Sequence, residues 1–248
     1  MPLRAHLVLL HVRHDRLLSP EMHGHHERRR SEQKNQQALH ELAGRQPVPT
    51  EVETADDFLL ESVAEAVGRH QPLLLVLGRP APTATPEEVV TSAALDLLRS
   101  LPCPLLIVPP VGAGAGPPRR LALAVDGADF SLYDHDTAVG QLLESLPAEL
   151  FILSVTGKKD PGTAAGHRAL HSVRHSRLAP APEGTAVHLV YHPHAPEGIL
   201  QGAAELNADL LVVIARRHSF LGSLFHRSVT AQLLVASPLP VLLLPTRD

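Results

Sequence analysis

A basic cluster lies between two apolar runs near the end of the chain, in the stretch RRHSFLGSLFHRSVT at 216–230. Guanidinium groups bind phosphate through paired N–H donors, and a helix N-terminus, expected here near Ser228, also favours anions. The sequence therefore predicts either an anion site built from side chains or a loop that faces solvent or an interface. The basic residues concerned are Arg216, Arg217, His218, His226 and Arg227.

A second group of ligand-type side chains lies in MHGHHE, with His23, His25, His26 and Glu27. Imidazole and carboxylate groups bind transition metals, and histidine-dense segments are a compositional sign of such sites. However, the segment borders three consecutive arginines at 28–30, and we expect it to be a mobile, solvated loop. We therefore expect no metal site.

The sequence lacks the common catalytic motifs. It has no nucleophile elbow, P-loop, metal-binding helix motif or cysteine and histidine motif. Cys103 is the only cysteine, which excludes an intrachain disulfide and a cysteine-based zinc cluster and fits a reducing cytoplasm. We expect a cytoplasmic protein that is not an enzyme.

The overall charge argues against two classes of partner. With histidines neutral, the net charge is −4, which gives no cationic field for nucleic acid or anionic lipid. No apolar run approaches the roughly 20 residues of a membrane span. We therefore expect neither nucleic acid nor a membrane as partner.

The elements that must position these residues are duplicated along the chain. SLPCPLLIVPP at 100–110 resembles SPLPVLLLP at 237–245, with Pro104 aligned to Pro240 at an offset of 136 residues. The same offset aligns Ser92 with Ser228. Two similar segments at constant separation indicate a tandem repeat.

A Gly- and Pro-rich segment separates the two repeats. PPVGAGAGPPRR cannot hold a helix or a central strand, which marks it as a linker. We therefore predict domains at 1–110 and 120–248, joined by a linker at 111–119.

Short apolar runs alternate with helical patterns in the second repeat. Strands buried on both faces of a parallel sheet read as continuous apolar runs, so the pattern predicts an α/β fold. A variable segment is expected between the second and third strands. The predicted strands are LALAVDG (121–127), ELFILSV (149–155), AVHLVYH (186–192), DLLVVIA (209–215) and PVLLLP (240–245).

The first repeat follows this scheme only from its second strand onward. HLVLLHV at 6–12 matches ELFILSV, but no segment corresponds to LALAVDG and the helix after it. Either the true start lies upstream of Met1, or this copy has lost a central strand and helix.

With these landmarks placed, the chain resembles the universal stress protein family in its tandem two-domain form. The residues that carry the resemblance are the strands above and the two repeat ends, TSAALDLLRSLPCPLLIVPP and HRSVTAQLLVASPLPVLLLP. The resemblance implies two flavodoxin-like or adenine-nucleotide α-hydrolase-like parallel-sheet domains, the first without its first strand and helix. It also implies that the last strands, PLLIVPP and PVLLLP, pair antiparallel.

ATP-binding members of this family have, as the resemblance implies, a glycine motif: Gly, two residues, Gly, nine residues, then Gly and Ser or Thr. Glycines allow backbone N–H groups to approach phosphates closely. Aligned on Ser228, the motif positions in the second repeat are Ile214, Arg217 and Arg227, none of them glycine. Asp126 matches the family's adenine-binding aspartate, and the alternative role for Asp126 is to cap a turn with Gly127.

The first repeat keeps a different part of this nucleotide site. Aligned on Ser92, the motif positions are Gly78, Ala81 and Thr91, so one glycine survives, and the adenine-binding aspartate has no counterpart. The stretch TPEE at 85–88 predicts a helix start whose glutamates would repel a triphosphate. Neither repeat therefore has a complete nucleotide site.

The expected function is stress-related regulation by binding, without a cofactor. The alternative is an ATP-binding universal stress protein that acts as a nucleotide-dependent switch or slow ATPase. We expect the two repeats to associate within one chain or through a homodimer, and a small anion or a protein stays open as the ligand.

Overall fold

The computed structural model describes residues 5–12, 25–79, 87–110, 116–133, 137–157, 164–176, 178, 185–216 and 228–247. The chain divides into two compact units, Met1–Gln71 and Pro72–Asp248. The two units hold separate sheets, one of two strands and one of seven strands.

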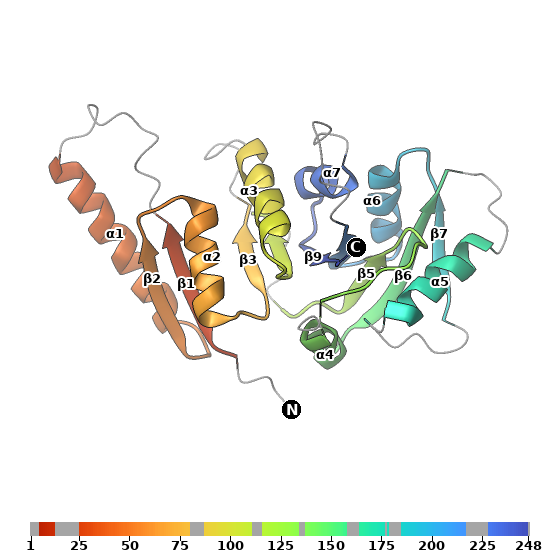
Figure 1. Cartoon of the computed structure of the whole chain (residues 1–248), viewed down its shortest axis with the longest axis horizontal. Coiled ribbons are helices and arrows are strands. Elements are labelled where there is room, and N and C mark those ends of the chain that lie inside the picture. Colours follow the sequence, from red (N-terminus) through yellow and green to blue (C-terminus); the bar gives the residue numbers. More distant parts are fainter. Residues whose placement is uncertain are drawn as a thin grey trace. The chain divides into compact units, whose positions relative to one another are not determined.

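The first unit is a two-stranded parallel sheet with two helices (Figure 1). Its strands pair from Leu7↔Thr50 to Val12↔Ala55. The loop expected around residues 23–30 was a wrong prediction, because His25 and His26 begin a 20-residue helix; His23 lies outside the described residues. The elements are β1 (Leu7–Val12), α1 (His25–Gly44), β2 (Thr50–Ala55) and α2 (Leu59–His70).

The second unit is built on a sheet with strand order β3-β4-β9-β8-β5-β6-β7. All neighbouring strands are parallel except β4 and β9. The strands are β3 (Leu75–Gly78), β4 (Leu105–Val108), β5 (Arg120–Ala124), β6 (Glu149–Thr156), β7 (Val187–Tyr191), β8 (Leu210–Ala215) and β9 (Val241–Pro245). The helices are α3 (Glu87–Ser100), α4 (Thr137–Ser145), α5 (Ala164–Ser176), α6 (Ala195–Glu205) and α7 (Val229–Ala236).

The fold is therefore α/β with mostly parallel sheets, as predicted. Each run proposed as a strand in the second repeat overlaps one of the strands β5 to β9. Helix α5 lies where the sequence predicted only a variable segment. Its buried residues, Ala169, Ser172 and Val173, are small or partly polar, so its apolar stripe is weak in the sequence.

The antiparallel pairing expected between the last strands of the two repeats is present. Leu105 of β4 lies opposite Leu243 of β9, and Ile107 lies opposite Val241. The Arg79 guanidinium, just beyond β3, donates to the carbonyl oxygens of Leu234, Val235 and Ser237 at the end of α7. The end of the first repeat thus belongs to the same sheet as the second repeat.

The chain forms two separate sheets because the described part of the first repeat lacks one strand that the second repeat has. In the second repeat β5 lies between β6 and β8 and bonds to both. The repeat relation makes β1 equivalent to β6 and β3 equivalent to β8. Without a counterpart of β5, nothing among the described strands joins β1 to β3. This is why the compact units divide at Gln71 and Pro72, while the predicted boundaries at 110 and 120 describe the sequence repeats.

Two apolar layers cover the faces of the seven-stranded sheet. Helices α3, α6 and α7 supply the cluster on one face, with Leu95, Ala203 and Leu233 among its buried side chains. Helices α4 and α5 supply the cluster on the other, with Leu143 and Val173. Figure 1 shows these two helix groups on opposite sides of the strands. No helix in the described ranges is both long and apolar enough to cross a bilayer.

Helix α6 lies close to the sheet at two glycines one turn apart. A Cβ at Gly198 would lie 2.6 Å from Val155 Cγ1 and 2.8 Å from His192 Cβ. A Cβ at Gly202 would overlap Leu153 Cδ1 and lie 2.9 Å from Val190 Cγ2. Because Leu153 is fully buried, its side chain has no space into which it can move.

We expect Gly202→Ala to lower the free energy of unfolding by about 1–3 kcal/mol, because overpacking outweighs the gain in helix propensity. The matched control is Gly68→Ala in α2, where an added Cβ meets no atom of the described residues within 4 Å. That control should stabilise its unit by about 0.5–1 kcal/mol. Urea unfolding followed by circular dichroism measures both changes, and a neutral Gly202→Ala would contradict the close approach.

Candidate functional site

The candidate site lies at the carboxyl ends of β5 and β8, which are adjacent parallel strands. From β5 the chain proceeds through β6 and β7 on one side and then returns to β8 on the other. Such a reversal of strand order opens a crevice beyond the carboxyl ends of the strands, where α/β proteins bind ligands. Asp126 follows β5, and Arg216 follows β8.

Asp126 holds a tight turn at the end of β5. Its Oδ1 accepts a hydrogen bond of 2.9 Å from the N–H of Ala128. Between them Gly127 has φ of +80°, and a Cβ there would lie 3.1 Å from Arg168 Cβ. The turn therefore needs glycine for both conformation and space. This is the turn-capping arrangement given above as the alternative to adenine binding, and the adenine role stays a prediction.

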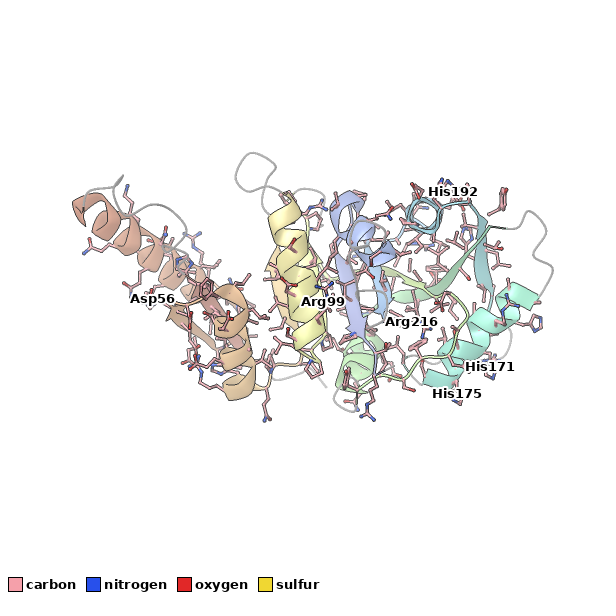
Figure 2. The ribbon with its side chains drawn as sticks, turned by 45° about the horizontal axis from the view of Figure 1, so that its top comes forward. Asp56, Arg99, His171, His175, His192 and Arg216 are labelled. Atoms are coloured by element: carbon pink, nitrogen blue, oxygen red, sulfur yellow. The ribbon has the colours of Figure 1, made fainter. Side chains whose placement is uncertain are left out.

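Arg216 bridges the ends of the two strands from the β8 side. Its Nη1 donates to the carbonyl oxygen of Asp129 at 2.9 Å, and its Nη2 donates to the carbonyl oxygen of Ala128 at 2.8 Å. Nη2 also lies 3.1 Å from Asp126 Oδ1. The residue is only 8% exposed and lies inside the seven-stranded unit (Figure 2). The guanidinium thus ties the end of β8 to the turn after β5.

The predicted anion cluster is only partly within the described residues. Arg217, His218, His226 and Arg227 lie outside them. Arg216 was grouped with these residues, but in the structure its guanidinium binds a carboxylate and two carbonyls instead. The sequence carried no signal for these contacts, since they join residues about 90 positions apart.

Ser228 lies at the start of α7, as predicted. It is the N-cap residue, is 8% exposed, and makes no side-chain capping bond. Its Oγ is buried and lacks a hydrogen-bond partner in the described part of the chain. A buried hydroxyl without a partner costs about 1–3 kcal/mol, so the helix start holds a donor and acceptor group suited to a ligand.

Of the other predicted site residues that are described, Ile214 lies near the carboxyl end of β8, whereas Gly78 and Ser92 belong to β3 and α3. Ile214 lies within β8, half-buried, opposite Leu244. Gly78 ends β3, where a Cβ would meet no described atom within 4 Å, so packing within the described residues does not require this glycine. Ser92 is exposed in α3, which begins at Glu87, and so it cannot cap that helix.

We expect the carbonyl contacts of Arg216 to matter more than its ion pair. Asp126 is 63% exposed, so solvent screens the pair, and Asp126→Asn should cost at most about 1 kcal/mol. Arg216→Met removes both carbonyl bonds and should cost about 2–3 kcal/mol. Urea unfolding of the two variants measures the difference, and equal losses would show that the ion pair carries the energy.

Comparison with solved structures places this architecture among known proteins. A universal stress protein from Archaeoglobus fulgidus DSM 4304 matches with a TM-score of 0.62 and 17% identity, over 98% of this chain and 86% of that one. A putative universal stress protein from Pseudomonas aeruginosa UCBPP-PA14 matches with a TM-score of 0.57 and 17% identity, over 99% and 84%. A functionally unknown protein, PA1789 from Pseudomonas aeruginosa PAO1, gives the same values.

These likenesses concern the fold, because the sequence identities are low. A search of curated proteins finds no match. The family model for universal stress proteins matches residues 118–245, which span the second repeat from the start of β5 to the end of β9. The chain therefore belongs to the universal stress protein family.

Proposed function

We propose that this protein is a stress-response regulator that acts by binding and does not take ATP in the manner implied for its family. Family membership supports the stress-response role. The proposal that the protein does not take ATP rests on the position of Arg216. Its guanidinium donates hydrogen bonds to Asp126 Oδ1 and to the carbonyl oxygens of Ala128 and Asp129.

The energetic argument concerns what a nucleotide would have to displace. A hydrogen bond from a charged donor contributes about 1.5–3 kcal/mol. Loss of the two carbonyl bonds of Arg216 would therefore remove much of the roughly 8 kcal/mol that micromolar binding represents. Asp126 Oδ1 also already accepts from Ala128 N–H, which leaves it less able to accept from an adenine. These costs favour a ligand other than ATP.

A second candidate, an ATP-dependent switch or slow ATPase, is favoured by one observation. Ser228 Oγ is buried without a described partner at the N-terminus of α7, where phosphate groups bind in many α/β proteins.

A smaller anion would satisfy the Ser228 hydroxyl without reaching Asp126. We therefore propose a small anion or an acidic group of a partner protein as the ligand at this helix.

Titration calorimetry with ATP separates the two candidates. We expect no saturable heat, which corresponds to binding weaker than about 1 mM or −4.1 kcal/mol. The control is Asp126→Asn, which should leave this result unchanged. Micromolar binding by the unmodified protein, weakened by Asp126→Asn, would overturn the proposal and establish the adenine role of Asp126.

A parallel titration with inorganic phosphate tests the anion ligand. Replacing Arg216, Arg217 and Arg227 together by glutamine should abolish phosphate binding, because the triple variant removes three positive charges from the stretch of sequence that precedes Ser228. Replacing Arg45 and Arg69 by glutamine removes charge elsewhere and serves as the control. Phosphate binding that persists in the triple variant would show that these arginines do not hold the anion.

Two further features of the proposal concern setting and assembly. The single cysteine supports a reducing compartment, and we place the protein in the cytoplasm. The β4 and β9 pairing supports association of the two repeats within one chain rather than through a homodimer.

A further inference from the structure

The first unit has very little buried apolar surface of its own. Among its described residues only Ser62 and Val63 of α2 are buried. Its sheet has two strands, and a two-stranded sheet alone is marginally stable in water. Small units of this kind usually depend on a disulfide, a metal or association. Its residues 1–71 include no cysteine, which leaves a metal ion or a partner.

Three side chains of metal-binding type converge where β2 meets the end of α2. Glu51, Glu53 and His70 each offer one ligand atom, and these atoms all lie within 4.8 Å of one another. Glu51 and Glu53 are two positions apart in a strand, so they share one face. His70 ends α2, and the left-handed residue Gln71, whose N–H bonds to Val67 O, fixes the helix end.

The arrangement around Glu53 orients its carboxylate. Arg69 Nη2 donates to Glu53 Oε2 at 2.8 Å, and His70 Nε2 lies 2.5 Å from Glu53 Oε1. Arg69 Nη1 also donates to Oε1 at 3.3 Å, so the guanidinium holds both carboxylate oxygens, and the imidazole faces Oε1. Partners that hold the far atoms of a ligand in this way orient metal ligands in many proteins. Glu53 is only 12% exposed, whereas Glu51 is open to solvent.

The charges at this cluster also suit a divalent cation. With His70 neutral, two carboxylates and one guanidinium leave a net charge of −1, which a divalent ion reverses to +1. An imidazole nitrogen and carboxylate oxygens are ligands of zinc at about 2.0–2.2 Å. Oε1 and Nε2 must separate slightly to admit an ion between them. Three protein ligands leave at least one position for water.

We propose that Glu51, Glu53 and His70 bind a divalent transition-metal ion, with Zn²⁺ as the probe, and that the ion links β2 to the end of α2. The link stabilises a unit that has almost no core. Binding to the folded form alone raises stability through mass action. This site is separate from the crevice at β5 and β8 and does not depend on the function proposed there.

The test measures Zn²⁺ affinity by competition with a colorimetric chelator in the full-length protein. We expect Glu51→Gln to weaken the tightest site at least about tenfold, and the double variant Glu51→Gln/His70→Gln to abolish it. Because Glu51 is exposed, its single variant should fold normally even if His70→Gln does not. Unchanged affinity in Glu51→Gln would overturn the proposal.

The chain offers a matched control at another histidine and glutamate pair. His188 Nε2 lies 2.7 Å from Glu205 Oε2, and this pair belongs to no three-ligand group in the described residues. His188→Gln/Glu205→Gln should therefore keep the tight Zn²⁺ site. The control also accounts for any weak binding of Zn²⁺ by histidines outside the cluster, since the chain has 17 histidines in all. Loss of the tight site in this control would place it elsewhere and contradict the proposal.

A second readout tests the structural role of the ion. Zn²⁺ should raise the melting temperature of the unmodified protein and of the His188→Gln/Glu205→Gln variant, and should raise that of Glu51→Gln less at the same zinc concentration. Backbone NMR resonances of residues 50–54 and 69–71 should shift on addition of one equivalent. Shifts confined to other regions would show that zinc binds outside this cluster.

Discussion

The antiparallel pairing of β4 with β9 is the interaction on which the second unit depends. It aligns Leu105 and Ile107 with Leu243 and Val241, all of them buried. Through this ladder the last strands of the two repeats share one sheet, and α3 and α7 pack beside each other in one apolar cluster. Each repeat therefore protects the edge that the other would expose.

The same fold shows what happens to a repeat without its central strand. The second repeat keeps β5 between β6 and β8, and its strands form one continuous sheet. In the described part of the first repeat no strand takes this position, and β1 and β2 form a sheet of their own. A sequence duplication has thus produced two unequal structural units, divided at Gln71 rather than at the linker.

The sequence predicted the parts of the fold that depend on local pattern. Continuous apolar runs identified the strands, and the constant offset between repeats identified which strands correspond. The weak apolar stripe of α5 and the polar composition of α1 hid those helices. The sequence placed Asp126 after a strand and Ser228 at the start of a helix, and it suggested the turn at Gly127. It could not predict the contacts of Arg216 with carbonyls far away in the sequence. Every residue has a backbone carbonyl, so the residue type does not show which carbonyl accepts a bond.

Cys103 provides a chemical reporter in the turn that leads into β4. Its thiol is 4% exposed in the turn between α3 and β4, and Sγ lies 3.5 Å from the carbonyl oxygen of Pro72. A thiol reagent can reach this sulfur only when the turn opens, since reaction requires an accessible thiolate. As the only cysteine in the chain, it reports on one place. The rate at which the native protein reacts with such a reagent therefore reports how often the segment that leads into β4 opens.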